Sequence, residues 1–229
     1  MDVSRIARAC AVSAALVLSA SPASAQLRPL EPIEWRLFTG SANVAAELGT
    51  SRLEDQRASL AGESGLLWEI ANFAAAWKTG RVVLEAAGTG QRIFKARERF
   101  EEPYEDVEPS DDGRRHDSGD YRISTTVRLT PDRFPITGAV RFGTRLPTTD
   151  NTTGLDRDAI DFFATIGAAS ARGPLDLSGE AGLGIHTTRE RRFEQDDLLL
   201  YAFRAEWTSS PVVPSIALIG QARSFTAGS

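Results

Sequence analysis

The 229-residue sequence contains one cysteine, one methionine and two histidines, and its hydrophobic share of 41% is slightly below the usual globular value. No window downstream of the N-terminus has the roughly 18 consecutive apolar residues of a membrane-spanning helix. A transmembrane β-barrel remains compatible with this composition, because only every second residue of its strands faces lipid. The sequence therefore excludes helical membrane spans and leaves soluble folds and barrels open.

The N-terminus has the features of a secretory signal peptide covering residues 1–25. Two arginines precede an apolar core at Ala9–Ala20, and the tripeptide "ASA" at 23–25 is an A-x-A cleavage site. We expect cleavage before Gln26, which removes Cys10 and leaves a mature chain without disulfides, thiolate chemistry or cysteine metal sites. Cys10 lacks the leucine-led context of a lipoprotein box, so no lipid anchor is expected.

The charge balance is acidic, with 26 Lys and Arg against 31 Asp and Glu and a net charge of −5 at pH 7. The predicted cleavage removes two arginines and one aspartate, so the mature chain is slightly more acidic still. A nucleic-acid-binding surface needs an excess of basic residues. We therefore expect no nucleic acid among the partners.

Alternation of apolar and polar residues dominates the chain, and helical periodicity is scarce. The clearest case is Asp120–Leu129, where the odd-numbered residues are Tyr, Ile, Thr, Val and Leu and the even-numbered residues are charged or hydroxylated. Nine such segments are predicted as strands: Asn43–Leu48, Leu66–Trp77, Arg81–Ile93, Asp120–Leu129, Thr137–Leu146, Ala159–Ala171, Leu175–Thr187, Asp197–Trp207 and Val213–Arg223.

Short and long connections alternate along the chain. The short ones are Lys78–Gly80, Thr130–Pro135, Ala171–Pro174 and Thr208–Pro211, and the long ones are Gly49–Ser64, Phe94–Gly119, Pro147–Asp158 and Thr188–Asp196. This rhythm, with strands of about ten residues, is typical of an all-β, antiparallel up-and-down transmembrane β-barrel. We predict one such domain over residues 26–229. A secreted or periplasmic β-sandwich is the alternative, since it also explains alternation.

Two observations suggest that the barrel domain is incomplete at the C-terminus. Nine strands is an odd number, whereas bacterial single-chain barrels have even numbers. The chain also ends in "QARSFTAGS" instead of the usual terminal aromatic residue. We therefore expect the nine strands to be part of a larger, even-numbered barrel, unless the weak first strand has been miscounted.

Aromatic and charged residues take distinct places in the predicted strands. Aromatic residues near strand ends suit an interfacial girdle: Trp77, Tyr121, Phe142, Phe162, Tyr201 and Trp207. Charged residues on the opposite faces are predicted to line the lumen: Glu85, Asp120, Arg122, Arg128, Arg141, Arg145, Glu180, Arg204 and Glu206. They form either a charged constriction that selects solutes or a ladder of salt bridges that closes a narrow barrel.

Two acidic segments raise the question of metal or surface binding. In "DNTTGLDRDAIDFF", Asp150, Asp156 and Asp158 could contribute to a calcium site, but the spacing is not that of a calcium loop. Asp and Asn in turn positions explain the segment equally well, so no metal is predicted. Phe100–Gly113 holds seven acidic residues and is expected to be a solvated mobile loop, with contact to lipopolysaccharide through divalent cations as the alternative.

Catalytic signals are few. Only His116 and His186 could act as general bases, and Ser178 lies roughly 20 Å or more from His186 along the same strand. The sequence contains no G-x-S-x-G, no H-E-x-x-H and no phosphate-binding glycine loop. We expect neither enzymatic activity nor a cofactor, with a lipid-cleaving barrel as the remote alternative.

The stretch "RLTPDRFPITGAVRFGTRLPTTDNTTGLDRDAIDFFATIGAA", followed by "GEAGLGI" and "EQDDLLLYAFRAEW", carries a resemblance over roughly Asp120–Trp207. The "R-F-G-x-R-L-P" strand end, the "G-L-D-x-D-x-x-D-F-F" strand entry and "G-L-G-I" resemble the bacterial outer-membrane barrels of the meta-pathway phenol-degradation family. The resemblance implies a passive channel in a Gram-negative outer membrane for small, hydrophobic or aromatic solutes. The expected partners are outer-membrane lipid, lipopolysaccharide and the solute; a closed structural or surface-interaction barrel is the alternative function.

Overall fold

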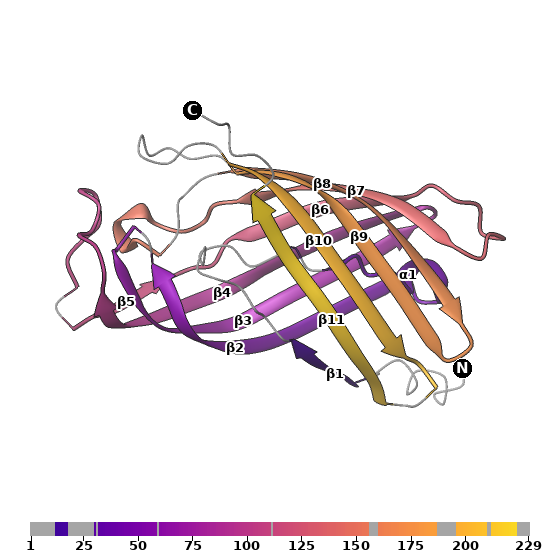
Figure 1. Ribbon diagram of the computed structural model, residues 1–229, viewed down its shortest axis with the longest axis horizontal. Helices are drawn as coiled ribbons and strands as arrows, with labels where there is room; N and C mark the ends of the chain where they lie inside the picture. The colour runs from indigo at the N-terminus through magenta and orange to yellow at the C-terminus, as the bar shows by residue number, and fades with distance from the viewer. Residues whose placement is uncertain are drawn as a thin grey trace, which may run out of the picture.

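The computed structural model describes residues 12–17, 30, 32–58, 60–110, 112–155, 160–186, 196–209 and 212–223. Eleven strands are joined in one sheet (Figure 1). They are β1 (Val12–Val17), β2 (Val44–Ala58), β3 (Glu63–Thr79), β4 (Val82–Arg99), β5 (Arg114–Asp117), β6 (Tyr121–Arg128), β7 (Thr137–Leu146), β8 (Asp161–Arg172), β9 (Leu175–His186), β10 (Asp196–Trp207) and β11 (Val212–Arg223). A short helix α1 (Arg36–Thr39) and a 3₁₀ helix η2 (Asn151–Thr153) complete the elements. None of the helices in these ranges is long and apolar enough to cross a membrane.

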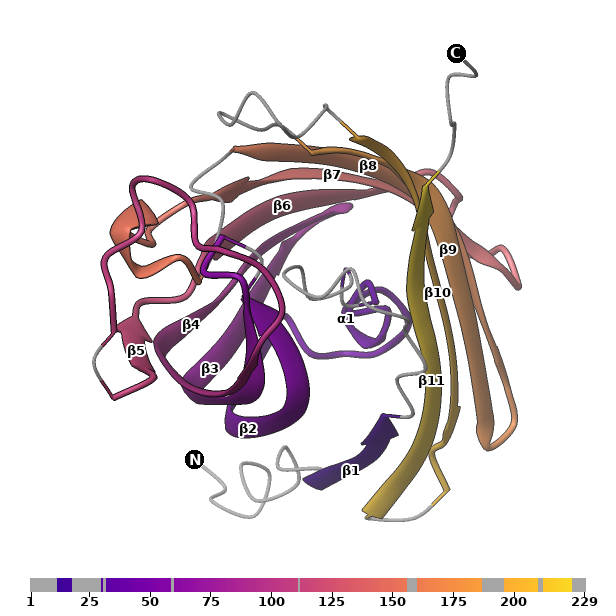
Figure 2. The ribbon, with the colours of Figure 1, turned by 60° about the vertical axis from the view of Figure 1, so that its left-hand side comes forward.

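Nine of these strands form an antiparallel up-and-down sheet, in the order β11-β10-β9-β8-β7-β6-β4-β3-β2. Figure 2 shows that this sheet curls around α1 as a half-barrel. The short strand β5 pairs with β4, and β1 lies parallel to the outer edge of β11. The predicted all-β, up-and-down antiparallel fold is confirmed. Residues 12–17, which belong to the predicted signal peptide, are those that form β1.

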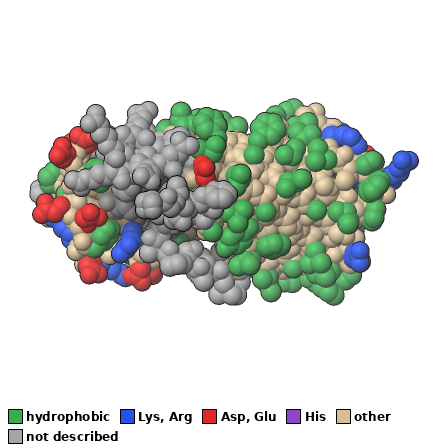
Figure 3. All heavy atoms as spheres, turned by 45° about the horizontal axis from the view of Figure 1, so that its top comes forward, with side chains coloured by type: hydrophobic (Ala, Val, Ile, Leu, Met, Phe, Trp, Pro, Cys, Tyr) green, Lys and Arg blue, Asp and Glu red, His purple; other side chains and the backbone are tan. Residues whose placement is uncertain are grey.

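The two faces of the sheet differ in chemistry as the alternation predicts. In β6, even-numbered residues such as Thr126 are buried, while Ile123 on the odd face is 51% exposed. The same holds in β7 and β8, where Arg141 and Thr165 are buried and Phe142 is exposed. Figure 3 shows hydrophobic side chains spread over the outer surface of the sheet. A soluble sandwich buries its apolar faces between two sheets, so the sandwich alternative is wrong.

Strands β2, β3 and β4 are longer than predicted. The expected long link Gly49–Ser64 is wrong, because residues 49–58 continue β2 and β3 already begins at Glu63. Likewise, β4 runs on to Arg99, and β5 forms inside the expected link Phe94–Gly119. Strand β6 pairs only with residues 82–88 of β4. The parts of β2, β3 and β4 nearer the β2–β3 turn therefore extend beyond β6 and the strands that follow it, and both of their faces can be polar. Because these parts of the chain are polar on both faces, the alternation pattern predicted β2, β3 and β4 shorter than they are.

The acidic segment Phe100–Gly113, for which a solvated mobile loop is expected, makes backbone contacts with neighbouring segments in the part that the structure describes. The Tyr104 N–H donates to the carbonyl of Leu60 at 2.9 Å, and the Glu108 N–H donates to that of Thr152 at 2.8 Å. Val107 is buried with Phe94 in a small apolar cluster. The described part of the segment therefore covers the tip of the β2–β3 hairpin.

Candidate functional site

The inner face of the curled sheet holds all nine residues that were predicted to line a lumen. Six of them are buried, namely Asp120, Arg128, Arg141, Arg145, Glu180 and Glu206. Three are half-buried, namely Glu85, Arg122 and Arg204. Their common placement follows from the two-residue period of a strand, which puts alternate side chains on one face.

Glu180 on β9 is the centre of this inner face. Its carboxylate accepts two hydrogen bonds from Nη2 of Arg141 on β7, at 2.9 and 3.0 Å. It also accepts from the hydroxyl of Thr165 on β8 at 2.7 Å and from the backbone N–H of Ile33 at 2.9 Å. The side chains of Arg141 and Glu180 are only 4% and 2% exposed. The pair therefore links three neighbouring strands and the N-terminal segment.

A second buried ion-pair group lies on the same face, toward the long-loop end of the strands. Arg145 on β7 contacts Asp120 at 3.0 Å and Asp161 on β8 at 2.9 Å. The sequence prediction placed Arg145 and Asp120 on the inner face but did not place Asp161 there. The alternation of β8 could have shown it, because Asp161, Phe163 and Thr165 share one face.

Hydroxyl groups and further carboxylates complete the polar lining. Ser124 and Thr126 donate to Glu85 at 3.1 and 3.0 Å. Arg92 lies 3.4 Å from Glu69, an inner-face pair that the prediction also missed because the surrounding β3 segment is apolar. The described inner charges are thus held largely by each other.

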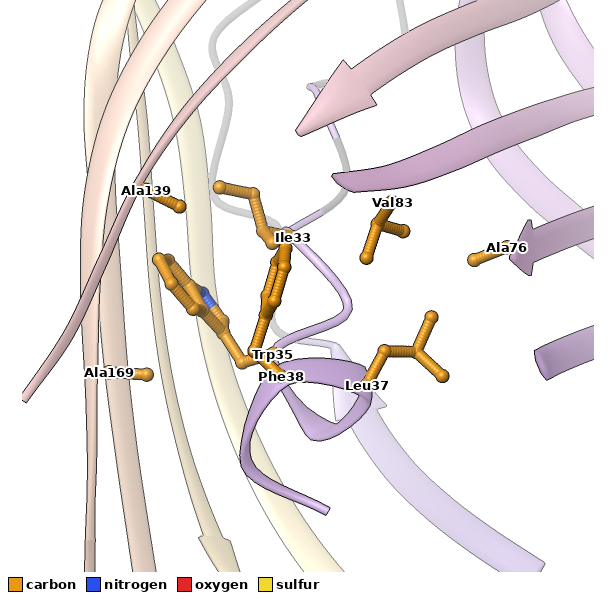
Figure 4. Close-up of a cluster of buried hydrophobic side chains, with 8 residues drawn as sticks. All are labelled: Ile33, Trp35, Leu37, Phe38, Ala76, Val83, Ala139 and Ala169. Atoms are coloured by element: carbon orange, nitrogen blue, oxygen red, sulfur yellow. The ribbon is translucent and has the colours of Figure 1, made fainter. Parts of the chain in front are cut away.

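The N-terminal segment from residue 32 to residue 43 runs inside the curl of the sheet, which the sequence did not predict. Figure 4 shows its apolar side chains packed against small inner-face residues of the strands. The cluster consists of Ile33, Trp35, Leu37, Phe38, Ala76, Val83, Ala139 and Ala169. Alanine at three inner positions leaves space for the large side chains. We call residues 32–43 the plug.

Polar contacts hold the plug as well. Arg36 forms an ion pair with Glu206 of β10 at 2.8 Å. At the end of α1, Lys78 donates to the carbonyl of Leu37 at 2.5 Å and Arg128 donates to that of Phe38 at 3.4 Å. Together with the Ile33–Glu180 hydrogen bond, these contacts fix the plug to strands in both halves of the curled sheet, namely β3 and β6 in one half and β9 and β10 in the other. The plug lies at the end of the sheet where the short turns are.

Glu34 is the plug residue whose carboxyl pKa differs from its usual value. Burial raises the pKa of Glu34, and the nearby Arg204 and Arg36 oppose that rise without cancelling it. Because burial disfavours the charged form of a carboxyl group, the plug is easier to accommodate when Glu34 is protonated.

Outside the curl, a compact unit is built around Glu63 at the start of β3. Its carboxylate accepts from Arg115 of β5 at 2.9 Å and from Arg99 of β4 at 3.1 Å. Burial raises the pKa of Glu63, but the hydrogen bonds from the two arginines outweigh it and leave the pKa below its usual value. This ion pair ties the protruding hairpin to β5.

The aspartates considered for calcium do not form a described site. Asp150 is exposed, and its Oδ1 accepts from the N–H of Thr152 at 2.9 Å, as in an Asx turn. Asp156 and Asp158 lie outside the described residues. Within the ranges that are described, no group of three or more His, Cys, Asp or Glu side chains is placed to hold a metal ion. The turn interpretation of Asp150 is therefore the better one.

The two histidines lie apart from the plug. His116 is exposed on β5, and His186 ends β9, its side chain falling outside the described part. In the register of the sheet, His186 pairs with Asp161 on one side and with Asp196 on the other. This backbone pairing alone assigns no chemistry to His186.

Comparison of the chain with protein-family models, with curated proteins and with solved structures finds no match in any of the three.

Proposed function

We propose that the protein is an outer-membrane β-barrel through which small solutes cross passively, and that the plug closes it in the described state. The proposal rests on one observation, the reversed polarity of the two faces of the curled sheet. Large hydrophobic side chains are exposed on the outside, and arginines and carboxylates are buried inside. In a bilayer this arrangement is favourable, because lipid takes the place of an apolar core against the outer face of the strands.

Strand lengths support a membrane setting. The strands from β7 to β11 have 10 or 12 residues each, and a tilted crossing needs about 9–11. Four of the predicted girdle residues, Trp77, Tyr121, Phe162 and Trp207, lie near strand ends with exposed side chains, which supports an interfacial position. The prediction of a strand-end position is wrong for Phe142 and Tyr201, which lie in the middle of β7 and β10.

The solute class is inferred from the lining and from the resemblance. Both signs of charge occur on the inner face, so no strong preference for cations or anions is expected. The resemblance to the phenol-degradation outer-membrane barrels favours small hydrophobic or aromatic molecules. Passive passage needs neither a cofactor nor an energy source.

A closed structural barrel is the second candidate. It is favoured by the mutual pairing of the inner charges, in particular Arg141 with Glu180 and Arg145 with two aspartates. Such a barrel would use its acidic long-loop end to meet lipopolysaccharide or a partner. The two candidates share the fold and the location and differ only in conduction.

Planar-bilayer conductance of the full chain and of a variant lacking residues 32–42 separates them. We expect rare openings from the full chain and frequent discrete steps from the deletion variant. Gly49→Ala, a change in an open part of β2, is the control and should behave as the full chain. A deletion variant that folds, judged by circular dichroism and heat-modifiable gel migration, yet stays silent would refute the channel and favour the closed barrel.

Location is tested separately by density fractionation of the host envelope. Recovery in the outer-membrane fraction supports the proposal. Recovery in the soluble periplasmic fraction contradicts both candidates, whatever the conductance result.

A further inference from the structure

A hollow of about 440 Å³ lies at the short-turn end of the sheet, next to the plug. It is bounded by Phe38 of α1 on one side and by the β6–β7 connection, including Phe134 and Pro135, on another. Two basic residues, Lys78 at the end of β3 and Arg128 at the end of β6, also line it. The hollow is large enough for a small organic molecule and combines apolar walls with positive charge.

The charge of the hollow is not fully balanced by the protein. Asp132 is the one carboxylate among the lining residues, and its side chain is 85% exposed. The Lys78 ammonium has three donors, and its described hydrogen bond is the one to the Leu37 carbonyl. The Arg128 side chain is only 9% exposed, and its Nη1 forms an ion pair with Asp132 at 2.8 Å. Its guanidinium also donates to the carbonyls of Phe38 and Pro131, and its buried Nε has no described hydrogen-bond partner. Lys78 therefore has donors left for an additional acceptor, and a ligand carboxylate beside Arg128 would replace the exposed carboxylate of Asp132.

The walls decide what kind of acceptor fits. Phe134 is 54% exposed at the rim, and Phe38 is buried deeper. An inorganic anion would leave these aromatic surfaces in contact with water, whereas a ligand with an apolar body would cover them. A ligand that carries both a carboxylate and an apolar body satisfies the two halves of the site together.

We propose that this hollow binds a small organic anion, whose carboxylate accepts hydrogen bonds from Lys78 and Arg128 and whose apolar body packs against Phe38 and Phe134. The inference goes beyond the proposed function, because binding at this mouth does not require that the barrel conducts. The same two basic residues hold the carbonyls at the end of α1, so the ligand would share its donors with the plug.

The chain has only two lysines, Lys78 and Lys95, which gives a direct test. Lys95 is exposed in the far part of β4 and serves as an internal control. The folded protein in nanodiscs is treated with a lysine-methylating reagent with and without phenylacetate, and labelling of each lysine is read by mass spectrometry. We expect phenylacetate to slow labelling of Lys78 at least threefold and to leave Lys95 unchanged. Unchanged labelling of Lys78 would overturn the proposal, as would equal protection by phenethylamine, which has the same body and the opposite charge.

Variants provide a second test. The affinity of each variant for phenylacetate is measured by titration calorimetry, with empty nanodiscs as the reference. Arg128→Gln should weaken binding at least fivefold, while Arg133→Gln, a change of an exposed arginine in the same connection, should not. Because Arg128 is buried, Lys78→Met compared with Lys95→Met repeats the test at a position that is less buried. Equal affinity of wild type and Lys78→Met would refute the site, and a silent conductance record would not affect either readout.

Discussion

Replacing Glu180 with alanine is the sharpest test of the inner-face network. The change removes the carboxylate that pairs with the buried Arg141. Breaking a buried ion pair from one side costs about 3–5 kcal/mol. The Thr165 hydroxyl and the Ile33 N–H lose their acceptor as well, which places the expected loss at the upper end of this range.

Urea unfolding in lipid vesicles, followed by tryptophan emission, measures the loss in free energy of unfolding. Glu47→Ala removes an exposed carboxylate from β2 and is the matched control, with an expected change within about 0.5 kcal/mol. The double variant Arg141→Met, Glu180→Leu should recover most of the loss, since a buried pair can be replaced by apolar residues at little cost. If Glu180→Ala unfolds like Glu47→Ala, or if the double variant is less stable than the single one, the inner face is not the buried network described above.

Three further predictions concern the plug and the strand packing. Trp35→Ala should lower the free energy of unfolding by about 3–5 kcal/mol, measured by the same urea unfolding, because it empties the apolar cluster around the plug. The raised pKa of Glu34 means that the folded state binds more protons just above the ordinary carboxyl pKa, so stability should fall as pH rises through that window; Glu34→Gln should flatten this part of a pH series of unfolding curves. Gly182→Ala should cost about 1–3 kcal/mol, since the added Cβ would meet the Ala164 carbonyl oxygen, whereas Gly49→Ala, with open space around it, should be near neutral in parallel melts.

The C-terminal half of the fold was largely predictable from sequence. Thr137–Leu146 matches β7, and the other predicted strands from Asp120 onward begin and end within two residues of the observed ones. The reason is that one face of these strands carries large apolar side chains and the other carries polar ones, so side-chain alternation is strong. Beyond Gly49, β2 is exposed over most of its length and is polar on both faces, so the same signal is missing there.

The candidate site was predictable in composition and not in geometry. Alternation placed Arg141 and Glu180 on one face, but their contact depends on the stagger of β7, β8 and β9, which local sequence does not encode. The plug escaped prediction because its four large apolar residues lie within six positions, too few for a strand or a helix pattern. The sequence feature that corresponds to the plug is the set of alanines at inner-face positions, Ala76, Ala139 and Ala169. These small residues indicate space for an inserted segment only when that segment is already known.

The position of the plug also sets an order of events in time. Residues 32–43 leave the ribosome before every strand that contacts them, yet their partners are spread over β3, β4, β6, β7, β8, β9 and β10. Glu180 and Glu206 do not exist as a binding surface until the strands that carry them have joined the sheet. The plug is therefore synthesised before these strands but can pack in its final position only after they have joined the sheet. The last strands to form thus fix a segment from the start of the fold in place.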